Sequence, residues 1–279
     1  MHIICVYEIK LINKYKRTRI NDTGSFIFNT LHSAVNNFCV IIALTNIFSY
    51  LVRDKINLIT QQGVNMDNVK AVIFRMINNT DELIHFADDT LVCAELIIKA
   101  FEKKGKLLLC GNGGSCADCD HITGELMKGF LKKRPLSGNI CTELEKQFKD
   151  DWATVKNKLQ QGLPAISLCA HSSLMTAFNN DVDPDLVFAQ QVLGYGTNND
   201  ILIAMSTSGN SKNVVHAVKT AKALGLKAIG FTGSSGGQLK KLCDICFCVP
   251  SDETYRVQEY HICIYHALCA GIEEYFFRI

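Results

Sequence analysis

The sequence predicts an α/β fold, a three-layer αβα sandwich in which a five-stranded parallel sheet lies between helices. Short apolar segments alternate with longer segments of helical periodicity, and the apolar segments end in clusters of Gly, Ser or Asp. Apolar segments this short and continuous are typical of strands that are buried on both faces. Regular alternation of strand and helix builds a parallel sheet covered on both sides, whose ligands bind beyond the carboxyl ends of the strands.

The predicted elements follow one another from Met66 onward. A first helix is indicated by apolar residues at helical spacing between Val69 and Ile77. The predicted strands are Lys106–Cys110, Ala165–Cys169, Ile201–Met205, Ala228–Phe231 and Ile245–Val249. The helices predicted between and after them are Ser115–Phe130, Pro184–Leu193, Lys212–Leu224 and Glu253–Phe277, the third of which Gly225 ends.

Composition excludes several classes of protein. Of the 279 residues 48% are hydrophobic and 20% are charged, which is typical of a globular chain rather than a disordered one. With 29 Lys and Arg against 27 Asp and Glu, no basic surface for nucleic acid is indicated. The 13 cysteines are odd in number and lie mostly in apolar segments, so we expect reduced core residues in a cytoplasmic protein. The Cys-x-x-Cys spacings at Cys116 and Cys243 lack the paired layout of a structural zinc site.

Residues 1–65 differ from the rest of the chain. A basic stretch, Lys14–Arg19, precedes an apolar stretch, Phe38–Val52, in the order of a membrane anchor. The uninterrupted apolar part is shorter than the roughly 20 residues that a spanning helix needs, so a membrane association is not expected. The alternatives to a membrane anchor are a helical arm and upstream sequence that precedes a true start at Met66. We favour a functional chain that starts at Met66.

The expected domain therefore covers residues 66–279, and one segment interrupts its alternation. Residues 132–162 are strongly charged and contain the only tryptophan, Trp152. The pattern predicts an inserted helix, and a solvated surface helix is favoured over a lid.

Two loops at predicted strand ends carry groups that bind anions. The loop Gly111–Ser115 lets the main chain approach a ligand at the start of a helix, but it lacks the patterns of P-loops and dinucleotide folds. The loop Ser206–Ser211 places four hydroxyls and several backbone amides at another helix start. A helix N-cap would explain one or two of these residues, whereas a phosphate site would explain the cluster.

Histidines and a carboxylate occur at spacings that permit acid–base or metal chemistry. His121 and Glu125 are four residues apart and so lie on one face of the predicted helix. Gln258 and His266 are eight residues apart, or about 12 Å along a helix, too far to bind one ion easily. Spacing alone therefore favours His266 as a core histidine.

These residues together resemble a known family. The segment Gly111-Asn-Gly-Gly-Ser115 with Asp118, His121 and Glu125 is followed by Asn180-Asp181, Ser206–Ser211, Thr232-Gly-x-x-Gly-Gly237 and Gln258-Glu-x-His261 with His266. This set resembles the sugar isomerase (SIS) domain family, and within it the phosphoheptose isomerase branch. The resemblance implies a flavodoxin-like fold and a homotetramer with active sites at subunit interfaces. The long N-terminus, expected as a helical arm, departs from the family. At Gly129 members of the branch often have an arginine, which leaves the exact sugar open.

The resemblance also implies roles for individual residues. One Zn²⁺ per site is expected on His121, Glu125, Gln258 and His266. Phosphate is expected on Ser206, Thr207, Ser208 and Ser211, and the sugar on Asn112, Gly113, Gly114, Ser115, Glu125, Asn180, Asp181 and Gln258.

The implied reaction converts D-sedoheptulose 7-phosphate to D-glycero-D-manno-heptose 7-phosphate through an enediol, with Glu125 as base and His266 as acid. The alternative is a non-catalytic SIS module that binds a phosphosugar or a protein, as in relatives that bind a replication initiator. A phosphosugar-sensing regulator is a further alternative, but residues 1–65 lack a convincing DNA-binding segment. The presence of both Glu125 and His266 favours the enzyme.

Overall fold

The computed structural model describes residues 66–136, 138–149 and 151–277. The predictions for residues 1–65, including the helical arm, lie outside these residues. Within them, no helix is both long enough and apolar enough to cross a membrane.

Five parallel strands form one sheet, as predicted. They are β1 (Leu107–Gly111), β2 (Ala165–Ser167), β3 (Ile201–Met205), β4 (Lys227–Thr232) and β5 (Ile245–Cys248), in the order β2-β1-β3-β4-β5. This is the flavodoxin-like order, in which the chain reverses direction across the sheet between β1 and β3. The crevice beyond the carboxyl ends of these two strands is therefore the expected place for a ligand.

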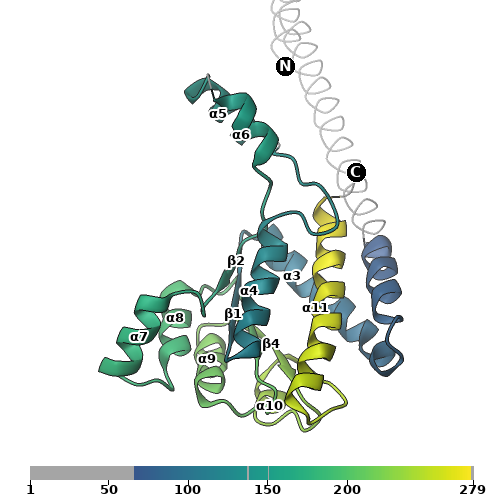
Figure 1. The fold of residues 1–279 in the computed structure, drawn as a ribbon, viewed down its shortest axis with the longest axis vertical. Coiled ribbons are helices and arrows are strands. Elements are labelled where there is room, and N and C mark those ends of the chain that lie inside the picture. Colours follow the sequence, from purple (N-terminus) through teal and green to yellow (C-terminus); the bar gives the residue numbers. More distant parts are fainter. Residues whose placement is uncertain (1–65, 137, 150, 278–279) are drawn as a thin grey trace, which may run out of the picture. The chain divides into compact units, whose positions relative to one another are not determined.

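Helices cover both faces of the sheet (Figure 1). After a helix over residues 66–77, they are η1 (Asp81–Phe86), α3 (Ala87–Glu102), α4 (Gly114–Met127), α5 (Asn139–Gln147), α6 (Trp152–Lys158), α7 (Ser172–Asp181), α8 (Val187–Tyr195), α9 (Lys212–Ala223), α10 (Leu239–Leu242) and α11 (Thr254–Phe276). α3, α4 and α11 lie on one side of the sheet, and α8 and α9 lie on the other.

The alternation of side chains along the strands creates two cores. In β1, Leu107 and Leu109 pack toward α3, α4 and α11, whereas Leu108 and Cys110 pack toward α8 and α9. Every residue of β1 and β3 is buried, which is why these strands are continuously apolar in sequence.

The charged segment forms two short helices, α5 and α6, rather than one. No side chain of α5 is buried, and Trp152 alone is buried in α6. An antiparallel bridge between Pro135 and Gln160 closes the base of this segment.

Candidate active site

Two glycines shape the loop that joins β1 to α4. Gly113 has φ +56°, and a Cβ there would meet nothing within 4 Å, so this backbone is open to a ligand. Gly114 lies against the side-chain amide of Gln258 on α11, where a Cβ would collide with that amide. No side chain caps the amino end of α4. The loop thus meets Gln258, while Ser115 is buried in the first turn, where the amides of Ser115 and Cys116 donate to Asn112 O and Gly113 O.

The serine-rich loop between β3 and α9 is organised by its own hydroxyls. Ser206 Oγ lies 2.9 Å from Ser211 Oγ and 3.4 Å from Ser208 Oγ. Ser211 precedes α9, but its side chain makes no capping hydrogen bond to that helix, so the N-cap interpretation does not explain the cluster. Backbone contacts hold the loop: Gly233 N donates to Thr207 O, and a Cβ on Gly209, with φ +66°, would collide with Gly236 O.

A pair of amide hydrogen bonds joins the two loops. Asn112 Nδ2 donates to Asn213 Oδ1 at 2.9 Å, and Asn213 Nδ2 donates to Asn112 Oδ1 at 3.0 Å. Because β1 and β3 are neighbours, the glycine loop and the serine loop lie side by side at one edge of the sheet. The predicted sugar and phosphate residues of these loops therefore share one site.

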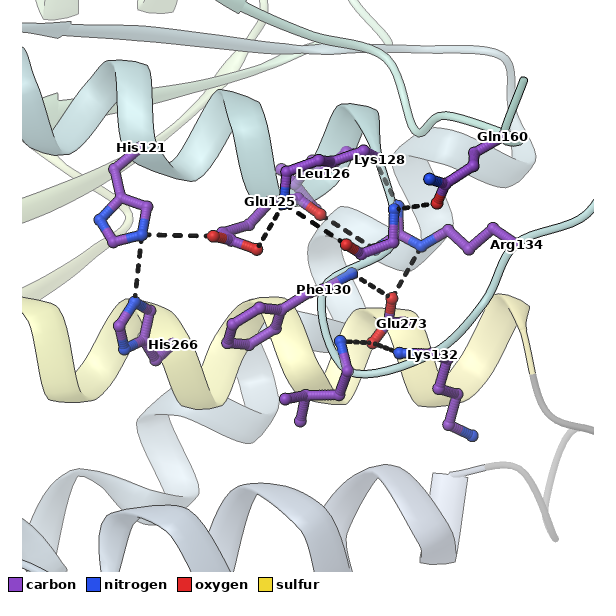
Figure 2. A network of polar contacts seen from close by, with 12 residues as sticks. His121, Glu125, Leu126, Lys128, Phe130, Lys132, Arg134, Gln160, His266 and Glu273 are labelled. Carbon is purple, nitrogen blue, oxygen red and sulfur yellow. Dashed lines mark hydrogen bonds and ion pairs between the residues drawn. The ribbon is translucent and has the colours of Figure 1, made fainter. Parts of the chain in front are cut away.

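The predicted acid, base and metal residues meet where α4 packs against α11 (Figure 2). His121 Nε2 lies 3.3 Å from Glu125 Oε1 and 3.5 Å from His266 Nε2. The side chain of Glu125 is 13% exposed, and its second oxygen lies 3.7 Å from Lys128 Nζ. Burial, and then the neighbouring His121, lowers the pKa of His266. His266 is thus half-buried against His121 rather than enclosed in the core, so its interpretation as a core histidine is wrong.

Tyr265 fixes the orientation of His121. Its hydroxyl lies 3.2 Å from Asp118 Oδ1 and 3.0 Å from His121 Nδ1. Burial raises the pKa of Asp118, although the hydrogen bond from Tyr265 opposes this shift. If the Tyr265 hydrogen goes to Asp118, the tyrosine oxygen accepts the Nδ1 hydrogen, and His121 Nε2 keeps a lone pair that faces Glu125 and His266.

Comparison with known proteins identifies the family of the chain. The SIS domain family matches residues 168–268. The phosphoheptose isomerase of a Nitratiruptor species is 41% identical over 192 residues, which cover 69% of this chain and 87% of the relative. That of Aneurinibacillus thermoaerophilus is 36% identical and covers 76% of this chain and 96% of the relative. The chain belongs to the phosphoheptose isomerase family. The solved phosphoheptose isomerase from Neisseria gonorrhoeae superposes with a TM-score of 0.55 at 32% identity, over 72% of this chain and 94% of that one.

Two residues expected at a phosphoheptose isomerase site lie elsewhere in this chain. Asn180 and Asp181 are exposed at the end of α7, where Asn180 Nδ2 donates to Asp181 Oδ1 at 2.8 Å. Among the described residues, no hydrogen bond joins either of them to the loops or to His121. Figure 1 shows α7 and α11 on opposite sides of the sheet.

Several residues that contact His121, Glu125 or His266 gave little signal in the sequence. Tyr265, which orients His121, is an aromatic residue in an apolar helix and is indistinguishable there from a core residue. Lys128 and Phe130 follow α4 and lie beside Glu125 and His266, respectively. Their roles depend on the packing of α4 on α11, which no local pattern encodes.

The nitrogen and oxygen atoms that converge at this site are of the kinds that bind zinc. His121 Nε2, His266 Nε2 and Glu125 Oε1 are lone-pair atoms that lie close together, an arrangement that requires a proton or a cation between them. Glu125 Oε2 is buried and accepts no hydrogen bond. However, no group of three or more His, Cys, Asp or Glu side chains in the described part of the chain is arranged as a metal site.

Proposed function

We propose that this chain is an aldose–ketose isomerase that converts D-sedoheptulose 7-phosphate to D-glycero-D-manno-heptose 7-phosphate. The observation that carries the proposal is the convergence of Glu125 and His266 on His121, along the helix that follows the glycine loop. An acid and a base together with a phosphate-binding loop are what isomerisation of a phosphosugar requires. A module that only binds phosphosugars has no need of this pair.

Binding of the phosphate orients the sugar. The hydroxyls of Ser206, Ser208 and Ser211 and the backbone amides at the start of α9 donate hydrogen bonds to the phosphate oxygens. The sugar then extends along Asn112 and Gly113, since the serine loop and the glycine loop are joined by the Asn112–Asn213 pair.

Proton transfer follows from the residue types. The Glu125 carboxylate takes a proton from C1 of the ketose while His266 gives a proton to the C2 oxygen, which yields the enediol. The C1 hydroxyl then returns its proton to His266 as the C1 carbonyl forms, and Glu125 gives its proton to C2. Such a placed pair contributes on the order of 10²–10⁴ in rate.

We also propose one zinc ion per site, held by His121, Glu125, Gln258 and His266. The close lone pairs of His121, Glu125 and His266 support it. Gln258 lies against Gly114 in its own chain and would join the site from a neighbouring subunit. When bound, zinc would polarise the substrate oxygens and stabilise negative charge on the enediol. A homotetramer with sites at subunit interfaces is proposed because Asn180 and Asp181 do not reach His121 of their own chain. The free thiols of the described cysteines support a cytoplasmic location.

The test supplies sedoheptulose 7-phosphate to the full chain and follows formation of the aldose. Glu125→Gln should abolish turnover while the phosphosugar still binds, because the serine loop is untouched. The control Glu95→Gln, at an exposed position on α3, should keep wild-type turnover. A chelator should remove activity and zinc should restore it.

Wild-type activity in Glu125→Gln would show that the base is assigned wrongly. A folded wild-type chain that binds the phosphosugar without turnover would favour the non-catalytic binding module. Activity that persists through exhaustive chelation would refute the zinc proposal.

A further inference from the structure

A buried ion pair links the ends of the two helices that carry Glu125 and His266. Arg134 and Glu273 have side chains that are 0% and 1% exposed, and Arg134 Nε lies 2.8 Å from Glu273 Oε1. Arg134 belongs to the segment that follows α4, and Glu273 lies two turns after His266 on α11. Burying two charges is costly unless nearly every polar atom is satisfied, so their other contacts are informative.

The side-chain carboxylate of Glu273 binds the backbone amides of the segment that follows α4. Phe130 N donates to Oε1 at 2.8 Å, and Leu131 N and Lys132 N donate to Oε2 at 2.7 and 3.0 Å. Together with Arg134 Nε, these amides give the carboxylate four hydrogen bonds (Figure 2). The backbone of these three residues is therefore fixed relative to α11.

Arg134 holds the end of α4 itself. Nη1 donates to Leu126 O at 2.6 Å, and Nη2 donates to Glu125 O at 3.0 Å. The last carbonyls of a helix have no partner within the helix, so the guanidinium supplies what the final turn lacks. The backbone of the catalytic base is thus tied, through Arg134 and Glu273, to the helix that carries the acid.

The same segment places an aromatic ring on the acid. The ring of Phe130 lies 5.4 Å from that of His266, centroid to centroid, with an angle of 35° between their planes. Since Glu273 fixes the amide of Phe130, the ion pair also determines where this ring lies.

We infer that Arg134 and Glu273 are positioning residues that set the relative placement of Glu125 and His266. This inference rests on the isomerase function proposed above. Neither residue touches the serine loop or the glycine loop among the described contacts. Their loss should therefore reduce the rate of proton transfer and leave phosphosugar binding nearly intact.

The test compares Arg134→Gln and Glu273→Gln with a matched control, Asp200→Asn, in the full chain. Asp200 is also a buried carboxylate with four hydrogen bonds, from Lys106 N, Lys106 Nζ, Thr197 N and Thr197 Oγ1, but it lies before β3 and none of these bonds involves α4 or α11. All three variants should unfold at lower temperature than the wild type. Below that temperature, kcat should fall roughly 10- to 100-fold in the Arg134 and Glu273 variants, with KM within about threefold, because small misplacements of reacting groups are costly. Asp200→Asn should keep the wild-type kcat.

A second measurement does not depend on turnover. The ring of Phe130 shifts the NMR resonance of the His266 Cε1 hydrogen, and Phe130→Leu gives the value without this effect. Arg134→Gln and Glu273→Gln should move the resonance toward the Phe130→Leu value, and Asp200→Asn should not. Arg134→Lys, which keeps the charge but not the paired donors, should restore kcat only in part.

Unchanged kcat in the Arg134 and Glu273 variants, an unmoved His266 resonance, or an equal fall of kcat in Asp200→Asn would each overturn the inference. An inactive wild-type chain would instead refute the isomerase function. In that case, the His266 resonance alone would decide whether the ion pair positions this helix junction.

Discussion

The imidazole of His261 should make the protein sensitive to mild acid. This side chain on α11 is fully buried, its Nε2 lies 3.2 Å from Thr232 O, and its Nδ1 has no hydrogen-bond partner. Burial lowers the pKa of His261 from 6.5 to about 4, although the hydrogen bond to Thr232 opposes this shift. Protonation in the folded state would place a charged N–H where nothing accepts it.

The magnitude follows from linkage between protonation and folding. The unfolded chain binds a proton at His261 near pH 6.5 and the folded chain only near pH 4, so stability falls as the pH decreases through this window. Between about pH 7.5 and pH 5, His261 alone should reduce the free energy of unfolding by about 2 kcal/mol.

Urea unfolding at these two pH values tests the reasoning. His261→Gln keeps a donor for Thr232 O but does not titrate, so its loss of stability on acidification should be about 2 kcal/mol smaller than that of the wild type. The control His85→Gln, at an exposed position on η1, should show the wild-type loss. Equal losses in His261→Gln and the wild type would refute the assignment of this acid sensitivity to His261.

Three further changes test the loops and the core. Ser206→Ala should raise KM for the phosphosugar about tenfold or more, because a hydrogen bond to a charged group is lost; an unchanged KM would remove the serine loop from the phosphate site. Gly209→Ala should weaken phosphosugar binding in the same assay, since φ +66° and the contact with Gly236 O leave no room for a methyl group; binding at wild-type strength would show that the loop tolerates a rearrangement. Gly271→Ala should destabilise the protein by about 1–3 kcal/mol in thermal unfolding, because its Cβ would lie 2.7 Å from Ile73 Cγ1; addition of Ile73→Val should recover part of the loss, and no recovery would place the strain elsewhere.

The sheet could be predicted from the sequence because burial on both faces leaves a local signal. All five strands appear within a few residues of their predicted positions, since each is a continuous apolar segment between polar loops. The helix α7 has no fully buried residue, and its apolar pattern is short, with Met175 and Phe178 partly buried against the core. The helix α10 is a single turn of four residues, too short for a periodic pattern.

The two loops of the site could be predicted for a related reason, since each follows directly from a strand that can be recognised. The junction of α4 and α11 could not be predicted by spacing. His121 and His266 are far apart in sequence, and only the packing of one helix on the other brings their nitrogens to 3.5 Å. From their spacing, Gln258 and His266 are considered as two ligands of one ion on a single straight helix. In the structure, Gln258 lies against Gly114 and His266 lies against His121. Their separation along α11 thus places them against different turns of α4.

The backbone near Phe130 explains why two charged residues, Arg134 and Glu273, occupy these buried positions rather than apolar ones. A buried ion pair can often be replaced by apolar residues of similar volume with little loss of stability. Here the three consecutive backbone amides of residues 130–132 donate to one carboxylate, which also accepts a hydrogen bond from Arg134. A single neutral acceptor has too few lone pairs to accept all four hydrogen bonds. The carboxylate in turn requires a buried cation, and a guanidinium can neutralise it while donating to the carbonyls of Glu125 and Leu126. Arg134→Met combined with Glu273→Leu should therefore destabilise the protein, in contrast to the usual tolerance of such exchanges, because the amides and the carbonyls that the pair serves would both remain without partners.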